Sequence, residues 1–351
     1  MGKDSCRTFW STVLLATCVA TLAPAEAVAQ QKVRVKLATL APDGSPWHRI
    51  LEDMGYEWQQ ATDGRVRLVI YPSGVAGDDR ATLRKIRHGQ LQAAGLMNIG
   101  LVELDDAFNL FQIPLFFEST DEFFYVLDRL SPLLSERLEE RGFVAVHWGY
   151  GGWMYFFSKV PASTVSDLKR LKMYTSAGDD RMVRIWRRNG YNPVALSATD
   201  IMVGLQSGMI DGLPAPPLGA LAFQWYRHTP YMLGQGLAPL VGATVVDKRT
   251  WAKMSEGDRA VLLESARRAA GRLASEIPQK DEEALAEMIT RGLQVIPVDL
   301  DDEAGSWRAA AESFAESFRA TMVPEDVFAL AVQYRAEYRQ RSPAAAGDSS
   351  P

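Results

Sequence analysis

Two hydrophobic periods alternate along the first third of the chain. Apolar side chains fill or alternate through 33–40, 66–71 and 91–97, which predicts three strands. Between them, apolar residues recur at helical spacing after Ser45, an N-cap residue followed by Pro46, and again over about 79–88. The order strand–helix–strand–helix–strand predicts a parallel sheet with right-handed crossovers.

A second block of alternating elements follows. The pattern predicts strands at 143–150, 153–160, 171–174 and 209–210, and helices at about 179–189 and 197–208. The first two strands flank a Gly-rich stretch at 149–152. We interpret this stretch as a hinge or crossover between the two blocks, and a simple hairpin turn is the alternative.

The C-terminal part of the chain is mainly helical. A long helical pattern extends from Ser255 toward Arg291, and Pro278 should kink it or split it in two. A strand is expected at 294–298, followed by two amphipathic helices with apolar residues over 307–318 and 327–338. The polar tail at 342–351 is predicted to be disordered.

The first 29 residues have the pattern of a secretory signal peptide. Two basic residues precede an apolar run over 9–23, and Ala27-Val28-Ala29 supplies a small-x-small cleavage pattern. A run of ~15 residues is shorter than the ~20 that span a bilayer, so a cleaved signal is favoured over a membrane anchor. Lipidation at Cys18 is a weaker alternative. Cleavage would remove both cysteines, Cys6 and Cys18, and with them any disulfide or thiolate site.

Composition narrows the classes of function. A chain of 351 residues with 47% hydrophobic residues is long enough for two domains with substantial cores. Its net charge of −5 offers no basic surplus for nucleic acid. The longest later apolar stretch, 236–246, is too short to span a membrane.

No catalytic or metal-binding pattern is present in the sequence. The four histidines are far apart, and no nucleophile elbow, Walker A or dinucleotide fingerprint occurs. A hydrolase that uses Asp200 or Asp211 is an alternative. A position in a helix's first turn accounts for Asp200, and the turn formed with Gly212 accounts for Asp211.

Aromatic residues gather at two places beside irregular segments. One cluster lies within 148–157 and the other within 223–231. Each alone would be ordinary core. Two clusters beside Gly- or Pro-rich segments fit an aromatic-lined cleft better.

Five segments, in order along the chain, carry a resemblance to a known family. They are VKLATLAPDGSPWH, GRVRLVIYPSGVAGDD, RHGQLQAAGL, SDLKRLKMYTSAGDD and ALSATDIMVGLQSGMIDGLPAPP. The mature chain resembles the DctP-type solute-binding subunits of TRAP transporters over essentially its whole length. The resemblance implies a two-lobed α/β fold, the periplasmic-binding-protein fold, with a long helix that spans both lobes. It also implies a periplasmic protein, not an enzyme, that traps a small organic molecule between the lobes and delivers it to an ion-coupled TRAP membrane permease. No cofactor, metal or nucleic acid is implied.

On this resemblance, residues 30–150 and about 237–280 would form the first lobe. Residues 151–236 and about 281–341 would form the second. A lipid-handling or sensory binding protein not coupled to transport is an alternative that the sequence leaves open.

The chain departs from the family where the ligand is held. Family members carry an arginine after the L-K-hydrophobic strand, and Tyr174 stands there in this chain. A second family arginine corresponds to Met154, and the usual polar segment after Asp-Gly is Leu213-Pro214-Ala215. Bidentate arginine is the usual partner of a buried carboxylate, so its loss predicts a ligand with apolar or aromatic surface and at most one charge.

The predicted ligand site therefore combines these positions with nearby aromatic residues and one polar residue from the first lobe. Its residues are Met154, Tyr174, Leu213, Ala215, Trp153, Phe223, Trp225, Tyr226 and Asn98. Asn98 is included because it ends a parallel strand, where such sheets bind ligands. A shift of one residue in the alignment would instead bring Arg170 or Arg181 to the cleft.

Overall fold

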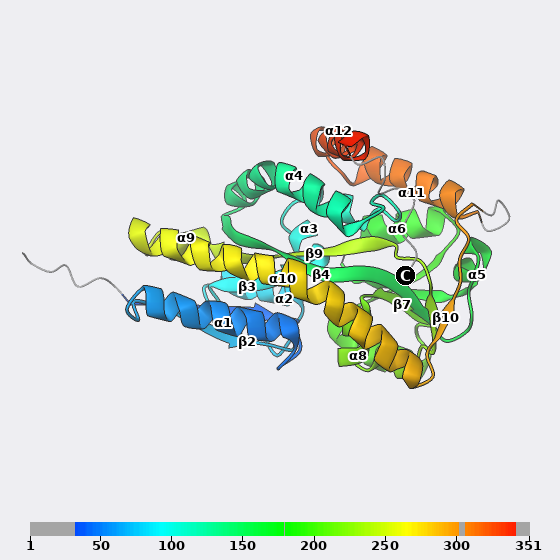
Figure 1. Ribbon diagram of the computed structural model, residues 1–351, viewed down its shortest axis with the longest axis horizontal. Helices are drawn as coiled ribbons and strands as arrows, with labels where there is room; N and C mark the ends of the chain where they lie inside the picture. The colour runs from blue at the N-terminus through cyan, green and yellow to red at the C-terminus, as the bar shows by residue number, and fades with distance from the viewer. Residues whose placement is uncertain (1–31, 179, 302–305, 342–351) are drawn as a thin grey trace, which may run out of the picture. The chain divides into compact units, whose positions relative to one another are not determined.

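A computed structural model describes residues 32–178, 180–301 and 306–341 (Figure 1). The predicted signal peptide at 1–29 and the predicted disordered tail at 342–351 lie outside these residues. The strands are β1 Val33–Thr39, β2 Val66–Tyr71, β3 Ala93–Met97, β4 Phe143–Ser158, β5 Lys172–Ser176, β6 Asn192–Leu196, β7 Gly212–Ala215, β8 Tyr231–Leu233, β9 Ala238–Asp247 and β10 Gln294–Ile296.

Helices connect and cover these strands. The α-helices are α1 Pro46–Ala61, α2 Asp79–Arg87, α3 Asn98–Val102, α4 Thr120–Glu140, α5 Val165–Arg170, α6 Asp180–Arg188, α7 Ile201–Ser207, α8 Pro217–Ala222, α9 Lys248–Trp251, α10 Glu256–Thr290, α11 Trp307–Thr321 and α12 Glu325–Arg341. The described residues also form the short 3₁₀ segments η1 Asp106–Gln112, η2 Ala198–Asp200 and η3 Trp225–Arg227.

The sheet has two parallel halves joined by antiparallel strands. Its order is β2-β1-β3-β9-β4-β7-β5-β6, and β8 pairs with β4 and β10. Strands β2, β1 and β3 are parallel to one another, as are β7, β5 and β6. Strand β9 runs antiparallel to both β3 and β4, and β4 runs antiparallel to β7. The mixed α/β fold expected from the two blocks is confirmed.

Strand β4 belongs to both halves. It pairs with β9 from Phe143 to Met154, and its last residues pair with β7 and β8. The register shifts between Tyr150 and Trp153, and Gly152 there has φ +104°, a conformation that favours glycine. The hairpin alternative for 149–152 is therefore wrong, because the Gly-rich stretch is an irregularity inside one long strand.

Helix α10 is also shared by the two halves. It packs against α1, β4 and α8, and in Figure 1 it runs diagonally from beside α1 to beside α8. Its 35 residues form one helix that continues through Pro278, so the expected split into two helices is wrong. Ser255 caps its start by accepting the Asp258 N–H, as the sequence predicts.

Other differences from the predicted elements are local. The strand expected at 209–210 lies instead at β7, and the strand expected at 294–298 ends at Ile296. Helix α4 and strand β9 were not among the predicted elements. Apolar faces of the sheet and helices form one large core cluster and a smaller one around β7 and α7.

Candidate functional site

The carboxyl ends of the two parallel halves face each other. Ser197, directly after β6, donates a hydrogen bond to Asp78, the N-cap of α2, at 2.7 Å. Arg80 of α2 donates to the Gly178 carbonyl after β5 at 2.6 Å. Loops that follow β5 and β6 thus contact the start of α2. We call this region the junction.

Asp79 is buried in the junction. It is 5% exposed, and its carboxylate accepts hydrogen bonds from the backbone N–H groups of Met97 and Gly100. Burial, followed by the neighbouring charge of Asp78, raises the pKa of Asp79 to about 7. Within the described residues no ion pair joins Asp79 to a lysine or arginine.

Tyr174 and Asn98 bring two further polar groups to this region. The Tyr174 side chain is 7% exposed, and its hydroxyl lies in the protein interior with Ser176 beside it. Burial and then the charge of Asp79 raise the pKa of Tyr174, and a hydrogen bond with Ser176 opposes the shift. Asn98 donates its amide to the Phe111 carbonyl at 3.4 Å, while its buried Oδ1 has no partner among the described residues.

A cavity of about 70 Å³ lies at the carboxyl ends of β1 and β3. Its wall includes no lysine, arginine, aspartate or glutamate among the described residues. The lining is Thr39, Ala41, Trp47, Leu51, Gly95, Leu96, Met97, His147, Gly149, Tyr150, Gly151, Leu240, Val241, Gly242, Ala243, Thr244 and Leu273. None of the nine predicted residues lines it, although Met97 directly precedes Asn98. Burial lowers the pKa of His147, which favours an uncharged imidazole in this wall.

The predicted residues of β4 and β7 lie in adjacent strands. Met154 and Trp153 are half-buried in β4, and the Trp153 indole donates to Thr120 Oγ1 at 2.7 Å. Leu213 and Ala215 are buried in β7, which pairs with β4. The smaller core cluster contains both together with Tyr174. Their contact with a ligand stays a prediction.

The aromatic residues of the cluster at 223–231 lie in two separate places. Phe223 and Trp225 stack with ring centroids 4.6 Å apart, and both are half-buried. The Tyr226 hydroxyl instead accepts a hydrogen bond from Arg291, just beyond the C-terminus of α10, at 3.1 Å. This pair lines a separate cavity of about 360 Å³ with Pro230 and Leu293.

A half-buried carboxylate also lies beside the irregular part of β4. Asp281 of α10 accepts hydrogen bonds from the backbone N–H groups of Leu218 and Trp153. It lies so close to Gly152 that a Cβ there would be 2.0 Å from its Oδ2. Asp281 therefore ties α10 and α8 to the point where β4 changes register. Neither Asp79 nor Asp281 was among the predicted site residues.

A family model described as bacterial extracellular solute-binding protein, family 7, matches residues 37–321. The chain belongs to this family. One relative is a solute-binding protein of Chromohalobacter salexigens, 25% identical over 65% of this chain and 68% of its own length. Another is the 2,3-diketo-L-gulonate-binding periplasmic protein of Escherichia coli, 23% identical over 71% of this chain and 76% of its own.

Solved structures of TRAP periplasmic solute-binding proteins share the fold. The Desulfovibrio salexigens protein with bound orotic acid matches with a TM-score of 0.80 at 19% identity, over 88% of this chain and 99% of its own. The C. salexigens protein with bound D-glucuronate matches with a TM-score of 0.78 at 21% identity, over 86% and 99%. The family consists of binding proteins, so this TRAP solute-binding protein is not an enzyme.

Two arginines were alternatives for the ligand site of this solute-binding protein. Arg170 is exposed and pairs with Asp167 of its own helix, 2.6 Å away. Arg181 of α6 makes two hydrogen bonds to Asp106 of η1, at 2.6 and 2.8 Å. Arg181 thus reaches the other half of the sheet, where it is held by a carboxylate.

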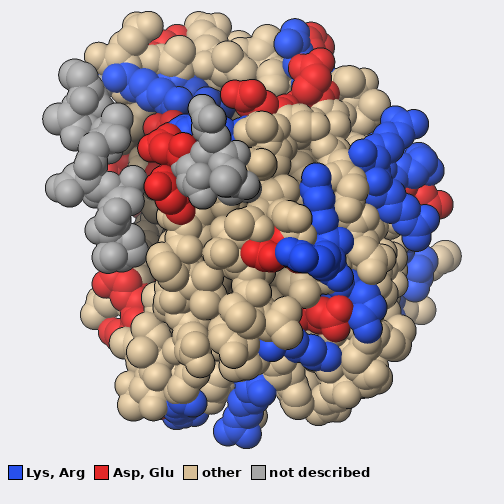
Figure 2. Space-filling view, turned by 90° about the vertical axis from the view of Figure 1, so that its right-hand side faces the viewer, with Lys and Arg blue, Asp and Glu red and all other residues tan. Residues whose placement is uncertain are grey.

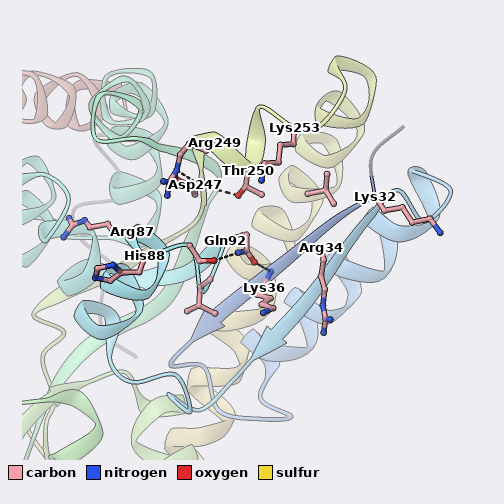
Figure 3. Close-up of a pocket in the computed structure, with 13 residues that line it drawn as sticks. Lys32, Arg34, Lys36, Arg87, His88, Gln92, Asp247, Arg249, Thr250 and Lys253 are labelled. Carbon is pink, nitrogen blue, oxygen red and sulfur yellow. Dashed lines mark hydrogen bonds and ion pairs between the residues drawn. The ribbon is translucent and has the colours of Figure 1, made fainter. Parts of the chain in front are cut away.

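The outer surface of this solute-binding protein carries many charged side chains, unlike the wall of the cavity at the ends of β1 and β3. Figure 2 shows one face on which several lysine and arginine side chains lie beside acidic ones. A groove of about 640 Å³ at the opposite ends of β1 and β3 from the junction is strongly basic (Figure 3). Its cationic lining comprises Lys32, Arg34, Lys36, Arg87, Arg249 and Lys253. Among the described helices none is long and apolar enough to cross a membrane.

Proposed function

We propose that this protein captures an organic ligand with a largely apolar or aromatic surface between the two halves of its sheet. It then delivers the ligand to an ion-coupled TRAP permease. The observation that carries the ligand class is the absence of a basic side chain from the cavity wall at the ends of β1 and β3, as the described residues form it. Several structural relatives were solved with sugar acids, such as D-glucuronate and L-gulonate, so this proposal sets the chain apart from them.

The side chains available for ligand contact support this class. Tyr174 stands where the family resemblance places an arginine, and its neighbour Asp79 is acidic. An organic anion bound there would lose its hydration without gaining a cationic partner, which costs several kcal/mol. Burial of apolar ligand surface in the same place would instead stabilise the complex by about 25 cal/mol per Å².

Capture would require the two halves to separate and close. The contacts Ser197–Asp78 and Arg181–Asp106 link the halves at the junction. Strand β4, with its register shift at Gly152, runs through both halves. A shift of this kind at one strand position is a suitable hinge, since a few residues there absorb the change in backbone angles.

Membership of the family supports delivery to a permease and a periplasmic location. Curated relatives include periplasmic binding proteins for sialic acid and for C4-dicarboxylates. The signal-peptide pattern at 1–29 supports export of this chain. Sequencing the N-terminus of exported protein, expected to begin at Gln30, tests the cleavage site.

The test of the ligand class is a calorimetric binding series on the purified exported protein. Aromatic acids, fatty acids and sterol-like compounds are compared with succinate, D-glucuronate and sialic acid. We expect saturable binding only in the first group. Tight binding of a sugar acid or dicarboxylate, with none of an apolar compound, would contradict the proposal.

A matched pair of glycine variants locates the site. A Cβ at Gly149 would contact Gly242 and Leu273, which line the cavity, at 3.6–3.7 Å. Gly149→Ala should therefore weaken binding several-fold while leaving stability nearly unchanged. Gly271→Ala, which adds the same methyl at an open position on α10, should leave binding unchanged. Equal affinities in the two variants would place the ligand elsewhere.

A further inference from the structure

A basic surface surrounds the groove at the amino ends of β1 and β3, and we call it the basic groove (Figure 3). Six lysines and arginines and one acid, Asp247, line it, whereas the whole chain has a net charge of −5. Asp247 pairs with Arg249 at 3.2 Å and accepts a hydrogen bond from Thr250 at 3.3 Å. The basic groove therefore concentrates positive charge at one place on an acidic protein.

The other cations of the basic groove are unpaired within the described chain. Among the described residues, no ion pair or side-chain hydrogen bond engages Lys32, Arg34, Lys36, Arg87 or Lys253. The arginines of α10 differ from them, since they pair with carboxylates of α1 or of their own helix. The positive charge of the basic groove is thus available to an anion outside the protein.

The register of β1 and β2 places like charges side by side at the basic groove. Lys32, Arg34 and Lys36 stand at alternate positions at the start of β1, so they share one face of the sheet. Arg34 is in register with Arg67 of β2, and both side chains are exposed. Like charges opposite each other on adjacent strands destabilise a sheet. An anion bound there would relieve this repulsion.

The shape of the basic groove suits an extended anionic surface better than one small anion. The cationic ends of Lys32, Arg34 and Arg87 point in different directions in Figure 3. They do not converge on one point, as the groups that bind a single carboxylate or phosphate do. The described lining also contains no tryptophan, tyrosine or phenylalanine, and side chains such as tryptophan and tyrosine commonly anchor protein partners.

The chain that precedes the basic groove supports a bilayer as its partner. The apolar run of the predicted signal peptide ends at residue 23, and residues 24–31 separate it from Lys32. Even fully extended, these eight residues span at most roughly 30 Å. Until cleavage, a signal inserted in the membrane would therefore hold the basic groove close to the lipid headgroups.

We propose that the basic groove, together with Arg67, binds the surface of a bilayer that contains anionic phospholipids. The lipid phosphates would lie against the unpaired cations and relieve the repulsion between Arg34 and Arg67. The cavity lies at the other ends of β1 and β3, so lipid binding would leave it uncovered. This inference goes beyond the proposed function and is independent of the identity of the ligand.

Sedimentation with lipid vesicles tests the inference on the purified exported protein. One set of vesicles is an equal mixture of phosphatidylglycerol and phosphatidylcholine, and the other set is phosphatidylcholine alone. We expect binding to the anionic vesicles only. Because salt screens exposed charges, that binding should weaken about tenfold or more between about 0.05 M and about 0.5 M salt.

A triple variant assigns the binding to the basic groove. Arg34→Gln, Lys36→Gln and Arg87→Gln together remove three of its unpaired cations. Each lysine or arginine near an anionic bilayer strengthens binding roughly fivefold, so we expect a loss of about 100-fold. These side chains are exposed or half-exposed, so the variant should fold as the wild type does.

The control variant loses the same charge from the other half of the sheet. It combines Arg184→Gln, Arg187→Gln and Arg188→Gln at exposed positions of α6. It should bind the anionic vesicles as the wild type does. The groove variant should keep or slightly raise its thermal midpoint, because it removes the repulsion between Arg34 and Arg67.

The outcomes separate this inference from the proposed function. Equal binding to the two kinds of vesicle, or equal affinities of the two triple variants, would overturn the inference. Tight binding of polyglutamate with none to anionic vesicles would also overturn it, because the partner would then be an acidic protein. Tight binding of a sugar acid in the calorimetric series would contradict the proposed function and leave this inference standing.

Discussion

Asp281 should make the stability of this protein fall as pH rises from mildly acidic to neutral. Burial raises the pKa of Asp281 from 3.8 to about 7, even though two backbone N–H groups oppose the shift. The folded protein therefore holds this proton more tightly than the unfolded chain does. Its contribution to stability is fully present below pH ~4 and is lost as pH rises toward 7.

The size of the effect follows from the two pKa values. For a single group that moves from 3.8 to about 7, the free energy of unfolding falls by about 2.5 kcal/mol between pH 5 and pH 7.5. Tyr150 and Tyr155 also face Asp281, and burial raises the pKa of each, so neither titrates in this range. Asp79 adds a similar dependence, which is present in both the wild type and the variant described next.

Asp281→Asn isolates the contribution. Between pH 5 and pH 7.5, the free energy of unfolding of this variant should fall by about 2.5 kcal/mol less than that of the wild type. Urea denaturation at several pH values measures it. Glu312→Gln, on an exposed face of α11, is the matched control and should follow the wild type. An Asp281→Asn protein with the same pH dependence as the wild type would refute the reasoning.

Two further substitutions should change stability by predictable amounts. Gly152→Ala should destabilise the protein by about 3 kcal/mol or more, because φ is +104° and the new Cβ would clash with Asp281. The control Gly271→Ala adds a methyl group in open space on a helix and should stabilise the protein slightly. Equal thermal midpoints for the two variants would contradict this expectation. Glu122→Ala should cost about 3–5 kcal/mol, because it removes the buried carboxylate that binds Arg339 of α12 at 2.6 Å, and Glu122→Gln should cost less. An unchanged urea midpoint for Glu122→Ala would show that this ion pair contributes little.

The first sheet half was predictable because its signals are local. Ser45 caps α1 and Asp78 caps α2, each by accepting a backbone N–H, and the strands between them have simple apolar patterns. Strand β9 was missed because nearly all of its residues are buried, so its apolar run has no strand period. The continuity of β4 could not be predicted because a bulge at glycine and a turn at glycine look alike in sequence.

The candidate site was only partly predictable. Tyr174 and Asn98 entered the predicted site because one replaces an expected arginine and the other follows a strand, and their contact with a ligand stays a prediction. Asp79 was missed because two acids at a helix start are typical of capping, and only Asp78 has that role here. Asp79 is instead buried against Gly100, far along the sequence, and a single sequence does not reveal such a contact.

The position of β9 has a consequence for how the chain folds during synthesis. This strand closes the first half of the sheet, since Ala93 of β3 pairs with Val246, yet it follows β5, β6 and β7 of the second half in sequence. The early β2-β1-β3 segment therefore keeps an unpaired edge until residue 247 has left the ribosome, and contacts this distant in sequence form slowly. If the N-terminal signal engages the export machinery first, the chain arrives there with no finished sheet to unravel.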